Sequence, residues 1–441
     1  MFLILLFAVL AGFVAWGQVN KRLYNDGFSP FNLLFYFWVL PFSLRLFGLS
    51  SYESEWDLNT VLVLFWVTVC LAFTCIVPAL LMKHYSFSVR RPIFERTMTL
   101  FRSKPLINWL LFFFILSFAA YVYSEFVTNP TGVAAFTLVN VPSTVLGDLH
   151  RWGKDTRWAI ITPLLFVLTP TLYFGFRVSQ KKRQKLLLLF LAMLYPLMGM
   201  MKLSRSDVFI SALNIAFVEY YYRKYNSRRS SISSPTQIKM VMALLVAIAL
   251  MYVSVVLRIG ADAPNVYGSL GFNLNVPSPL YEVLALVYAY FALPFENFHR
   301  FLMSYTGDLH LGISFFRPLL SMFGQGEVAD SMIATINFNV ISGAANTGTF
   351  LTPVYAELGM VGLVIVPPIY GALVNILYGR FRIKPNFMNF LLYMTFVYPW
   401  TWLFFTNAFS VLTFYINSAF VIFLTFLVAR RRTGRRTLLN D

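Results

Sequence analysis

Charged residues are scarce in this chain. Only 12% of its 441 residues are Asp, Glu, Lys or Arg, whereas 58% are hydrophobic and the mean hydropathy is +0.68. A soluble domain of this length would carry far more charge, so lipid must be the solvent for much of the surface. The composition therefore excludes a soluble enzyme and indicates an integral membrane protein.

Cysteine and histidine are also rare. The two cysteines, Cys70 and Cys75, lie inside one apolar segment, which indicates packing rather than a disulfide framework or a metal site. The four histidines follow no metal-ligand spacing, so we expect no metal and no other cofactor. The chain has no P-loop, no Rossmann glycine pattern, no Ser-His-Asp signature and no clustered DxD. It also has no soluble cytoplasmic domain of the kind that a sugar-nucleotide transferase uses.

Long apolar segments are what the chain does have. A helix of about 20 apolar residues spans a bilayer. We expect such helices at roughly 2–17, 29–48, 60–82, 105–126, 157–177, 186–203, 207–222, 240–257, 351–378, 386–405 and 410–429. The first is predicted to be a retained helix, because no basic region precedes it. The predicted fold is all-α and polytopic, with about 11 transmembrane helices in a single integral membrane domain, residues 1–441.

Basic residues sort into alternate loops. Clusters at 21–22, 83–104, 177–185, 223–239, 380–384 and 430–436 hold 26 of the 35 lysines and arginines. This positive-inside pattern predicts a multi-pass protein of a bacterial inner membrane, with the N-terminus outside and the C-terminal tail inside. The net charge of +17 then reflects loops that meet the lipid bilayer, and it does not indicate a nucleic-acid partner.

One outer loop, 258–350, is far longer than a connection requires, and loops of this length usually carry function. Its apolar stretch Tyr281–Leu293 is too short to span a bilayer. We expect that stretch to lie on the membrane surface or to dip into it. The sequence thus places a large periplasmic loop, with a membrane-surface helix, opposite the basic loops.

Nine basic residues remain on the predicted outer side. They are Arg45, Arg151, Lys154, Arg157, Lys202, Arg205, Arg258, Arg300 and Arg317. We expect Arg45 to extend to the membrane interface. Arg205 has two readings that the sequence leaves open: an ion pair with Asp207, or an anion site at a helix N-terminus. Arg258, at the mouth of the large loop, is equally open between a headgroup anchor and a site residue.

Acidic and histidine side chains mark two further positions. Glu296, His299 and Arg300 share one face if their segment is helical. A Glu296–Arg300 ion pair beside a surface histidine is the favoured interpretation, and a site element with a titrating histidine is the alternative. Glu357 is expected two to three turns inside an apolar helix, where a carboxylate is costly and usually functional. Gly359 and Gly362 follow it and allow close helix contact.

An ordered set of segments resembles the O-antigen polymerase family, the Wzy-like polymerases of oligosaccharide repeat units. The segments are Lys202–Ser206, Arg258, Pro294–Phe298, Asn346–Phe350 and Pro353–Gly362. The last is similar to the family's Tyr-x-Asp/Phe-Gly-x-x-Gly pattern, with Glu357 and Leu358 as conservative departures. The resemblance covers roughly residues 195–365.

The resemblance implies a metal-independent glycosyltransferase of GT-C type, active at the periplasmic face. Its substrate would be an undecaprenyl-diphosphate-linked oligosaccharide, and undecaprenyl diphosphate would leave when repeat units are joined. A chain-length regulator and a flippase are the protein partners that the resemblance implies.

This chemistry needs cations for the diphosphate and a base for the acceptor hydroxyl. We expect Arg205 and Arg258, with Arg300 or Arg317, to bind the diphosphate. Glu357 or His299 would act as the catalytic base. The predicted glycan contacts are Asn297, Asn346 and Tyr355.

Two other functions stay open at this point. An O-antigen ligase would share the large periplasmic loop and its arginines, and would carry a functional histidine there; His299 and His310 are the residues in question. A polysaccharide flippase or transporter more often has twelve or more spans in paired halves and no large outer loop. A chain-length regulator is excluded, because it would have only two spans.

Overall fold

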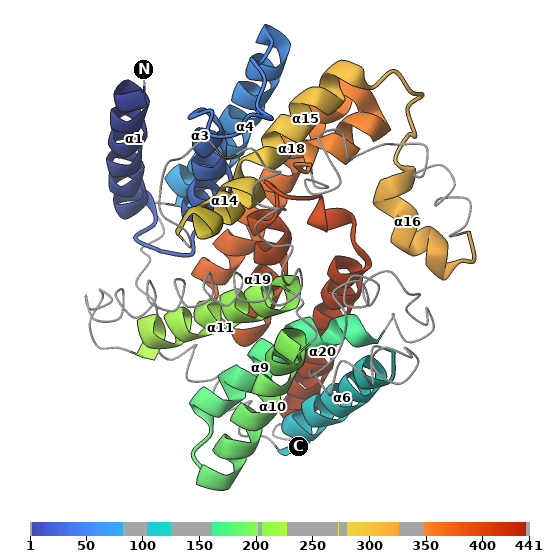
Figure 1. Ribbon diagram of the computed structural model, residues 1–441. Helices are drawn as coiled ribbons and strands as arrows, with labels where there is room; N and C mark the ends of the chain where they lie inside the picture. Colours follow the sequence, from blue (N-terminus) through green and yellow to red (C-terminus); the bar gives the residue numbers. More distant parts are fainter. Residues whose placement is uncertain are drawn as a thin grey trace. The chain divides into compact units, whose positions relative to one another are not determined.

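The computed structural model describes residues 2–82, 104–124, 161–201, 205–226, 272, 280–325 and 348–437 (Figure 1). These residues are almost entirely helical, and the one β feature among them is an isolated bridge between Ser50 and Phe272. The all-α prediction is confirmed for this part of the chain.

Ten of the eleven apolar segments coincide with helices, and the segment at 240–257 lies outside the described residues. The helices that match them are α1 (Phe2–Leu23), the continuous run of α2 (Pro30–Leu34), η1 (Phe35–Val39) and α3 (Leu40–Arg45), α4 (Leu58–Met82), α6 (Lys104–Val122), η3 (Thr162–Leu164) with α9 (Leu165–Val178), α10 (Lys182–Met201), α11 (Arg205–Asn226), α18 (Leu351–Ile383), α19 (Phe387–Thr401) and, after the short η5 (Ala408–Ser410), α20 (Leu412–Thr437).

Three helices are long and apolar enough to cross a membrane: Leu58–Leu80 of α4, Lys182–Met200 of α10 and Leu351–Ile383 of α18. Shorter apolar helices occur at Leu106–Val122, Thr162–Val178 and Leu412–Leu424. These lengths suit a membrane protein. The count of about 11 spans stays a prediction.

The helices group into two compact units, each assembled from separate stretches of chain. Unit 1 comprises Met1–Phe87, Pro264–Ile383 and Phe396–Tyr415, and unit 2 comprises Ser88–Ala263, Lys384–Thr395 and Ile416–Asp441. Contacts thus divide the predicted single membrane domain into two groups of helices. Every stretch described for the large outer loop belongs to unit 1.

Helices α4 and α18 pack against each other in unit 1. Buried residues of α4 recur at helical spacing, among them Leu64, Val67 and Leu71, while large apolar side chains such as Phe65 and Phe73 are exposed on other faces. At Gly371 of α18, a Cβ atom would lie 2.0 Å from Oγ1 of Thr74. Close helix approach therefore requires glycine there. The exposed faces of these two helices are apolar, as a lipid-facing surface must be.

Three helices occupy the described part of the large outer loop: α14 (Leu280–Phe291), α15 (Leu293–Ser304) and α16 (Ile313–Met322). The expected surface helix corresponds to α14. It buries Ala285 and Tyr288 in a cluster with Phe272 and with Ala292, the residue that follows the helix, and Leu44 and Leu49 pack against this cluster. One side of α14 is thus covered by protein, and its contact with a membrane stays a prediction.

Unit 2 holds an aromatic core. Helices α9, α10 and α11 pack on one another. Phe174 of α9 stacks on Phe387 at 5.2 Å between ring centroids, and Phe217 of α11 lies 5.2 Å from Phe390. At the ends of α9 and α11, Glu219 pairs with Arg177 and Arg223 at 3.1 and 2.5 Å.

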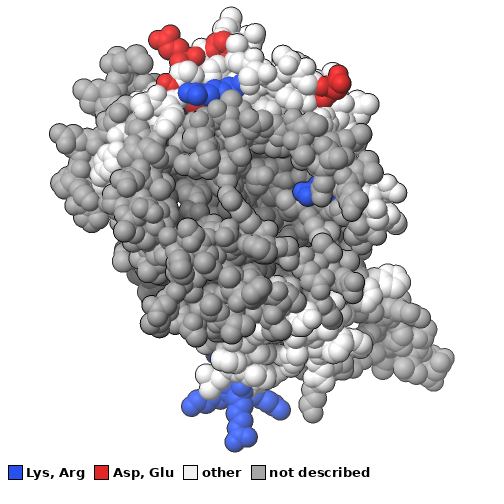
Figure 2. Space-filling model, turned by 45° about the vertical axis from the view of Figure 1, so that its right-hand side comes forward, with Lys and Arg blue, Asp and Glu red and all other residues white. Residues whose placement is uncertain are grey.

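Residues that the charge pattern assigns to the inner side meet within unit 1. Asp26, buried after α1, accepts hydrogen bonds from Arg382 Nη1 at 2.7 Å and from the Tyr378 hydroxyl at 2.9 Å. This pair closes the turn between α1 and α2 against the last turns of α18. Charged side chains are otherwise few: on the face shown in Figure 2, those of the described residues stand in small groups.

Candidate functional site

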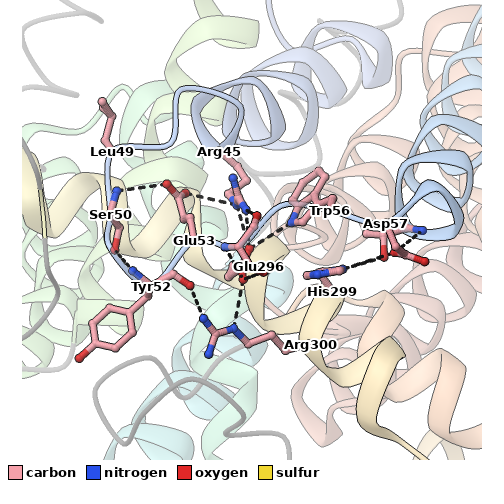
Figure 3. A network of polar contacts seen from close by, with 12 residues as sticks. Arg45, Leu49, Ser50, Tyr52, Glu53, Trp56, Asp57, Glu296, His299 and Arg300 are labelled. Atoms are coloured by element: carbon pink, nitrogen blue, oxygen red, sulfur yellow. Dashed lines mark hydrogen bonds and ion pairs between the residues drawn. The ribbon is translucent and has the colours of Figure 1, made fainter.

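Glu296 is the centre of a polar network that joins α3, α15 and the segment between α3 and α4 (Figure 3). Its side chain is fully buried. One oxygen, Oε1, accepts from the backbone N–H of Ser54 at 3.1 Å, the Ser54 hydroxyl at 2.6 Å and Arg300 Nε at 3.1 Å. The other, Oε2, accepts from Arg45 Nε and Nη2 at 3.0 and 2.5 Å and from Trp56 Nε1 at 3.0 Å.

Arg45 does not extend to the membrane interface, so that prediction is wrong. Its side chain is buried, and it also pairs with Glu53 Oε1 at 3.3 Å and donates to the Ser54 carbonyl at 2.6 Å. The guanidinium lies 4.6 Å from the ring centroid of Trp56. Two carboxylates and an aromatic face replace the water that a solvated arginine would keep. Sequence spacing could not reveal this, because Glu296 lies 251 residues further along.

The two carboxylates beside Arg45 differ in acidity. Burial raises the pKa of Glu53 above its usual range, although hydrogen bonds from Tyr288 and Ser50 and the charge of Arg45 oppose the shift. For Glu296, burial also acts to raise the pKa, but the hydrogen bonds from Ser54 and Arg45 outweigh it and the net pKa is lowered. Glu296 is therefore held as a carboxylate with its acceptor capacity filled, which suits fastening rather than proton transfer.

His299, one turn from Glu296 on α15, is buried and is not the surface histidine that we favoured. Its Nδ1 lies 2.8 Å from the Thr60 hydroxyl and 3.6 Å from Asp57 Oδ1. Asp57 also caps α4 by accepting from the Thr60 backbone N–H at 3.1 Å. Burial lowers the pKa of His299, and the charges of Glu296 and Asp57 only partly offset that effect. The histidine therefore ties α15 to the start of α4 as a mostly neutral ring.

The predicted Glu296–Arg300 ion pair is confirmed, with Nε 3.1 Å from Oε1. Arg300 also donates to the carbonyl oxygen of Tyr52, and its side chain is one third exposed. Its predicted contact with a diphosphate stays a prediction.

A second group of residues forms around Glu357 on α18. Its side chain is fully buried, and Oε2 accepts from the backbone N–H of Gly312 at 2.7 Å. The backbone N–H groups of His310 and Leu311 donate to the carbonyls of Ala356 and Glu357 at 3.3 and 2.9 Å. Three consecutive residues before α16 are thus bound to one turn of α18.

A break in α18 explains this arrangement. Gly359 has φ 58° and ψ −148°, far from helical values and accessible essentially to glycine alone. In a continuous helix, the carbonyls of Ala356 and Glu357 would accept from the residues four positions on, across Gly359. Because the break removes those donors, the amides of His310 and Leu311 take their place.

Aromatic rings adjoin Glu357. Phe301 of α15 and Tyr305, which directly follows that helix, stack at 4.8 Å between ring centroids, and the ring of Tyr355 of α18 lies 6.2 Å from that of Tyr305. Burial raises the pKa of Tyr305, and the charge of Glu357 adds to that shift. Helix α15 thus connects both groups: Glu296 and His299 contact the Arg45 side, while Phe301 packs on Ala356.

The other predicted site residues are placed as follows. Asn297 is buried on α15, with polar contacts of its own. Arg317 is exposed on α16. Arg205 is the first residue of α11 in unit 2, where Asp207 accepts from the Tyr195 hydroxyl at 3.2 Å. Arg258 and Asn346 lie outside the described residues.

His310 is a residue that the sequence did not assign to the Glu357 turn. Its Nδ1 is buried and has no hydrogen-bond partner among the described residues. The only sequence signal was that His310 is one of the histidines of the outer loop, which does not reveal the contact with α18.

No three His, Cys, Asp or Glu residues in the described ranges are grouped so that they could hold a metal ion. No protein-family model, no curated protein and no solved structure matches this chain. The likeness to the Wzy-like polymerases thus rests on the sequence motifs alone.

Proposed function

We propose that this protein is a membrane-embedded glycosyltransferase that joins polyprenyl-diphosphate-linked oligosaccharide repeat units at the outer face of a bacterial inner membrane, as the Wzy-like polymerases do. The observation that carries the proposal is Glu357, a fully buried carboxylate in an apolar helix, bound to the outer-loop turn at a helix break. A carboxylate in such a place is costly and is usually kept for function.

Glu357 acts as the base in this proposal. The acceptor hydroxyl oxygen bonds to the anomeric carbon of the donor glycan while the bond from that carbon to the diphosphate oxygen breaks. The hydroxyl proton passes to Glu357, and undecaprenyl diphosphate leaves with the electron pair. The aromatic faces of Tyr305 and Tyr355, adjacent to Glu357, suit contact with the apolar faces of sugar rings.

Arginines supply the charge for the leaving diphosphate, because a guanidinium binds phosphate oxygens in pairs. Arg205 and Arg258 are our first candidates, with Arg317 exposed on α16 as the third. Arg300 is the weakest candidate, since Glu296 and the Tyr52 carbonyl already engage it.

The test is the surface-glycan ladder of a strain that lacks the gene, complemented with the wild type or with single variants. Glu357→Gln should leave lipid A-core with one repeat unit and no ladder, and should lower polymerisation of purified lipid-linked units roughly 10²–10⁴-fold. Asp308→Asn is the matched control, since Asp308 is exposed and close in sequence to the same turn. A full ladder from Glu357→Gln at normal expression would exclude Glu357 as the base.

An O-antigen ligase is the second candidate. It is favoured by the buried Nδ1 of His310, which has no hydrogen-bond partner in the part of the chain that the structure describes and lies in the turn bound to Glu357. Loss of a ligase would leave lipid A-core with no repeat unit at all. Loss of a flippase would also leave the core bare, but lipid-linked units would then accumulate on the cytoplasmic side. An unchanged ladder would direct the same experiment to capsule or exopolysaccharide.

A further inference from the structure

Large apolar side chains are exposed at the end of α15, on α16 and on the segments directly before and after α16. Five of them are between 48% and 81% exposed: Met303, Leu309, Leu311, Phe316 and Phe323. In contrast, Tyr288 of α14 is buried. Water contact with so much adjacent hydrocarbon is unfavourable. An exposed apolar surface of this kind marks a membrane or protein contact.

Leu311 is held in an unfavourable conformation that keeps it exposed. Its φ is 50°, in the left-handed region that leucine rarely adopts, and its side chain is 79% exposed. The backbone N–H groups of Leu311 and Gly312, bound to Glu357, fix the turn in this state. The same three-residue turn thus holds the Glu357 carboxylate on one side and presents a leucine side chain outward on the other.

This exposed surface continues the apolar face of α18. A Cβ at Gly359 would lie 3.5 Å from Cδ2 of Leu309. The next residues of α18, Met360 and Val361, are more than half exposed, and α18 is long and apolar enough to cross a membrane. Lipid that covers this face of α18 therefore meets Leu309 at the level of the helix break.

The arginine on α16 also fits a position at the surface of a membrane. Arg317 is exposed and next in sequence to the exposed Phe316, and the exposed Phe323 directly follows the end of α16. Aromatic rings and arginines are the side chains that anchor helices at the boundary between lipid chains and phosphate headgroups.

We infer that α16 and the turn before it lie in the outer surface of the bilayer, where Leu311, Phe316 and Phe323 insert among lipid chains and Arg317 meets phospholipid phosphates. This membrane contact holds the turn that binds Glu357 at a fixed depth. The inference does not depend on the proposed enzyme activity, because it concerns only which solvent covers this surface.

Spin-label accessibility tests the inference on the full-length protein in nanodiscs of phosphatidylcholine and phosphatidylglycerol. Phe316→Cys, Phe323→Cys and Met303→Cys each receive a nitroxide, and the native Cys70 and Cys75 are buried, so background labelling is low. Val361→Cys serves as the lipid control and Ser51→Cys, exposed between α3 and α4, as the water control. Collisions with oxygen and with a polar nickel chelate are compared at each site.

We expect labels at residues 316 and 323 to favour oxygen over the nickel chelate, as at residue 361, and the label at residue 51 to show the reverse. Preference for the nickel chelate at residues 303, 316 and 323 would overturn the inference, since it would place this surface in water. Protection from both reagents would overturn it in favour of a protein partner or a second copy of the chain. Three independent positions keep the test valid if one variant fails to fold.

The arginine contact has its own test. Added phosphatidylglycerol should shift the Phe316→Cys label toward oxygen accessibility, and Arg317→Gln should abolish that shift. An equal response with and without Arg317 would remove the phosphate contact from the inference.

Discussion

Glu296 is a carboxylate whose acceptor sites are taken up by donors from three segments of chain. Arg45 comes from the end of α3, Ser54 from the segment before α4, and Arg300 from α15 itself. A buried carboxylate is tolerated only when charge and hydrogen bonds replace its water. Because these donors converge on one side chain, Glu296 fastens α15 to α3 and to the segment before α4.

Replacement of Glu296 by glutamine should destabilise the protein by about 3–5 kcal/mol, because it leaves Arg45 buried with a weakened partner and turns an amide N–H₂ toward other donors. Thermal unfolding in detergent measures this, with a thiol-reactive dye that reports exposure of the buried Cys70 and Cys75.

Glu55→Gln is the control for this variant, since Glu55 is an exposed carboxylate in the same segment. A surface change of this kind usually alters stability by less than about 0.5 kcal/mol. Equal unfolding temperatures for Glu296→Gln and Glu55→Gln would show that Glu296 does not fasten α15 to α3 and to the segment before α4. A double variant with Arg45→Gln should lose less than the sum of the two single losses, because the side chains interact directly.

Stability should fall with acidification through His299. Burial lowers the pKa of its folded state below the ordinary value of 6.5, so the unfolded chain binds the proton first as the pH decreases. The contribution of His299 is therefore complete above pH 6.5 and is lost as the pH falls toward the lowered pKa. In the His299→Gln variant, the unfolding temperature should fall less between pH 7.5 and 5.5 than it does in the wild type.

Glu53 acts in the opposite direction in the same experiment. Burial raises its pKa, so its folded state binds a proton before the unfolded chain does and gains stability on acidification. In the Glu53→Gln variant, the unfolding temperature should therefore fall more steeply on acidification than in the wild type. A wild-type slope that His299→Gln leaves unchanged would mean that the histidine does not titrate differently on unfolding.

For single residues, the sequence predicts contacts between side chains that are close in the chain and misses contacts between side chains that are far apart in it. The Glu296–Arg300 pair followed from a spacing of four residues on one helix, and the structure confirms it. Arg45 was assigned to the interface because it lies near the end of an apolar segment, and its main partner Glu296, 251 residues further along, gives no local signal. The contact of His310 with α18 was missed for the same reason, since a turn 46 residues before Ala356 leaves no periodic signal.

Helix α18 is two helices joined at Gly359. The part before Gly359 is bound to the His310–Gly312 turn, and the part after Gly359 packs on α4, with Gly371 against Thr74. The two parts thus belong to different packing environments, and Gly359 permits the change of direction between them.

Gly359→Ala should therefore lower stability by about 1–3 kcal/mol and reduce activity, because alanine strains at φ 58° and ψ −148°. Gly12→Ala is the matched control, since a Cβ at Gly12 of α1 meets nothing within 4 Å. Alanine at a regular helical position stabilises by roughly 0.5–1 kcal/mol relative to glycine. The unfolding temperature should fall for Gly359→Ala and rise for Gly12→Ala. Equal shifts for the two variants would show that α18 has no strained break at Gly359.

Helix positions could be predicted from sequence because hydropathy is a local property. The run from α2 through α3 and the helices α4 and α10 lie where the apolar segments indicated them. In the outer loop, by comparison, the apolar stretch at Tyr281–Leu293 predicted α14 alone. Helices α15 and α16, of 12 and 10 residues, are mixed in composition, so tertiary contacts rather than a long apolar run define them.

The whole molecule has a predicted orientation that the described contacts fit. Arg45, Glu53, Glu296 and Arg300, all expected outside, meet in one network, and Asp26 and Arg382, both expected inside, meet in another. A chain with the wrong order of spans would bring residues of opposite sides together.

Cysteine labelling in intact spheroplasts tests the orientation. Ser51→Cys should react with a membrane-impermeant maleimide, whereas Gln180→Cys, in the loop between α9 and α10, should react only after the membrane is opened. Both positions are exposed, and the native cysteines are buried. Labelling of residue 180 in intact spheroplasts would reverse the predicted orientation for that loop.

The long separation between the paired charges also affects how the protein is made. Arg45 leaves the ribosome 251 residues before Glu296, an interval of about 13–50 s at ordinary rates of translation. Asp26 waits longer, for a partner 356 residues later. During these intervals both charges must stay hydrated at the edges of the membrane, so the early helices can insert but cannot take up their final packing. A chain terminated before Glu296 would lack the distant partners of Arg45 and Asp26, and cellular proteases would degrade it faster than the complete protein.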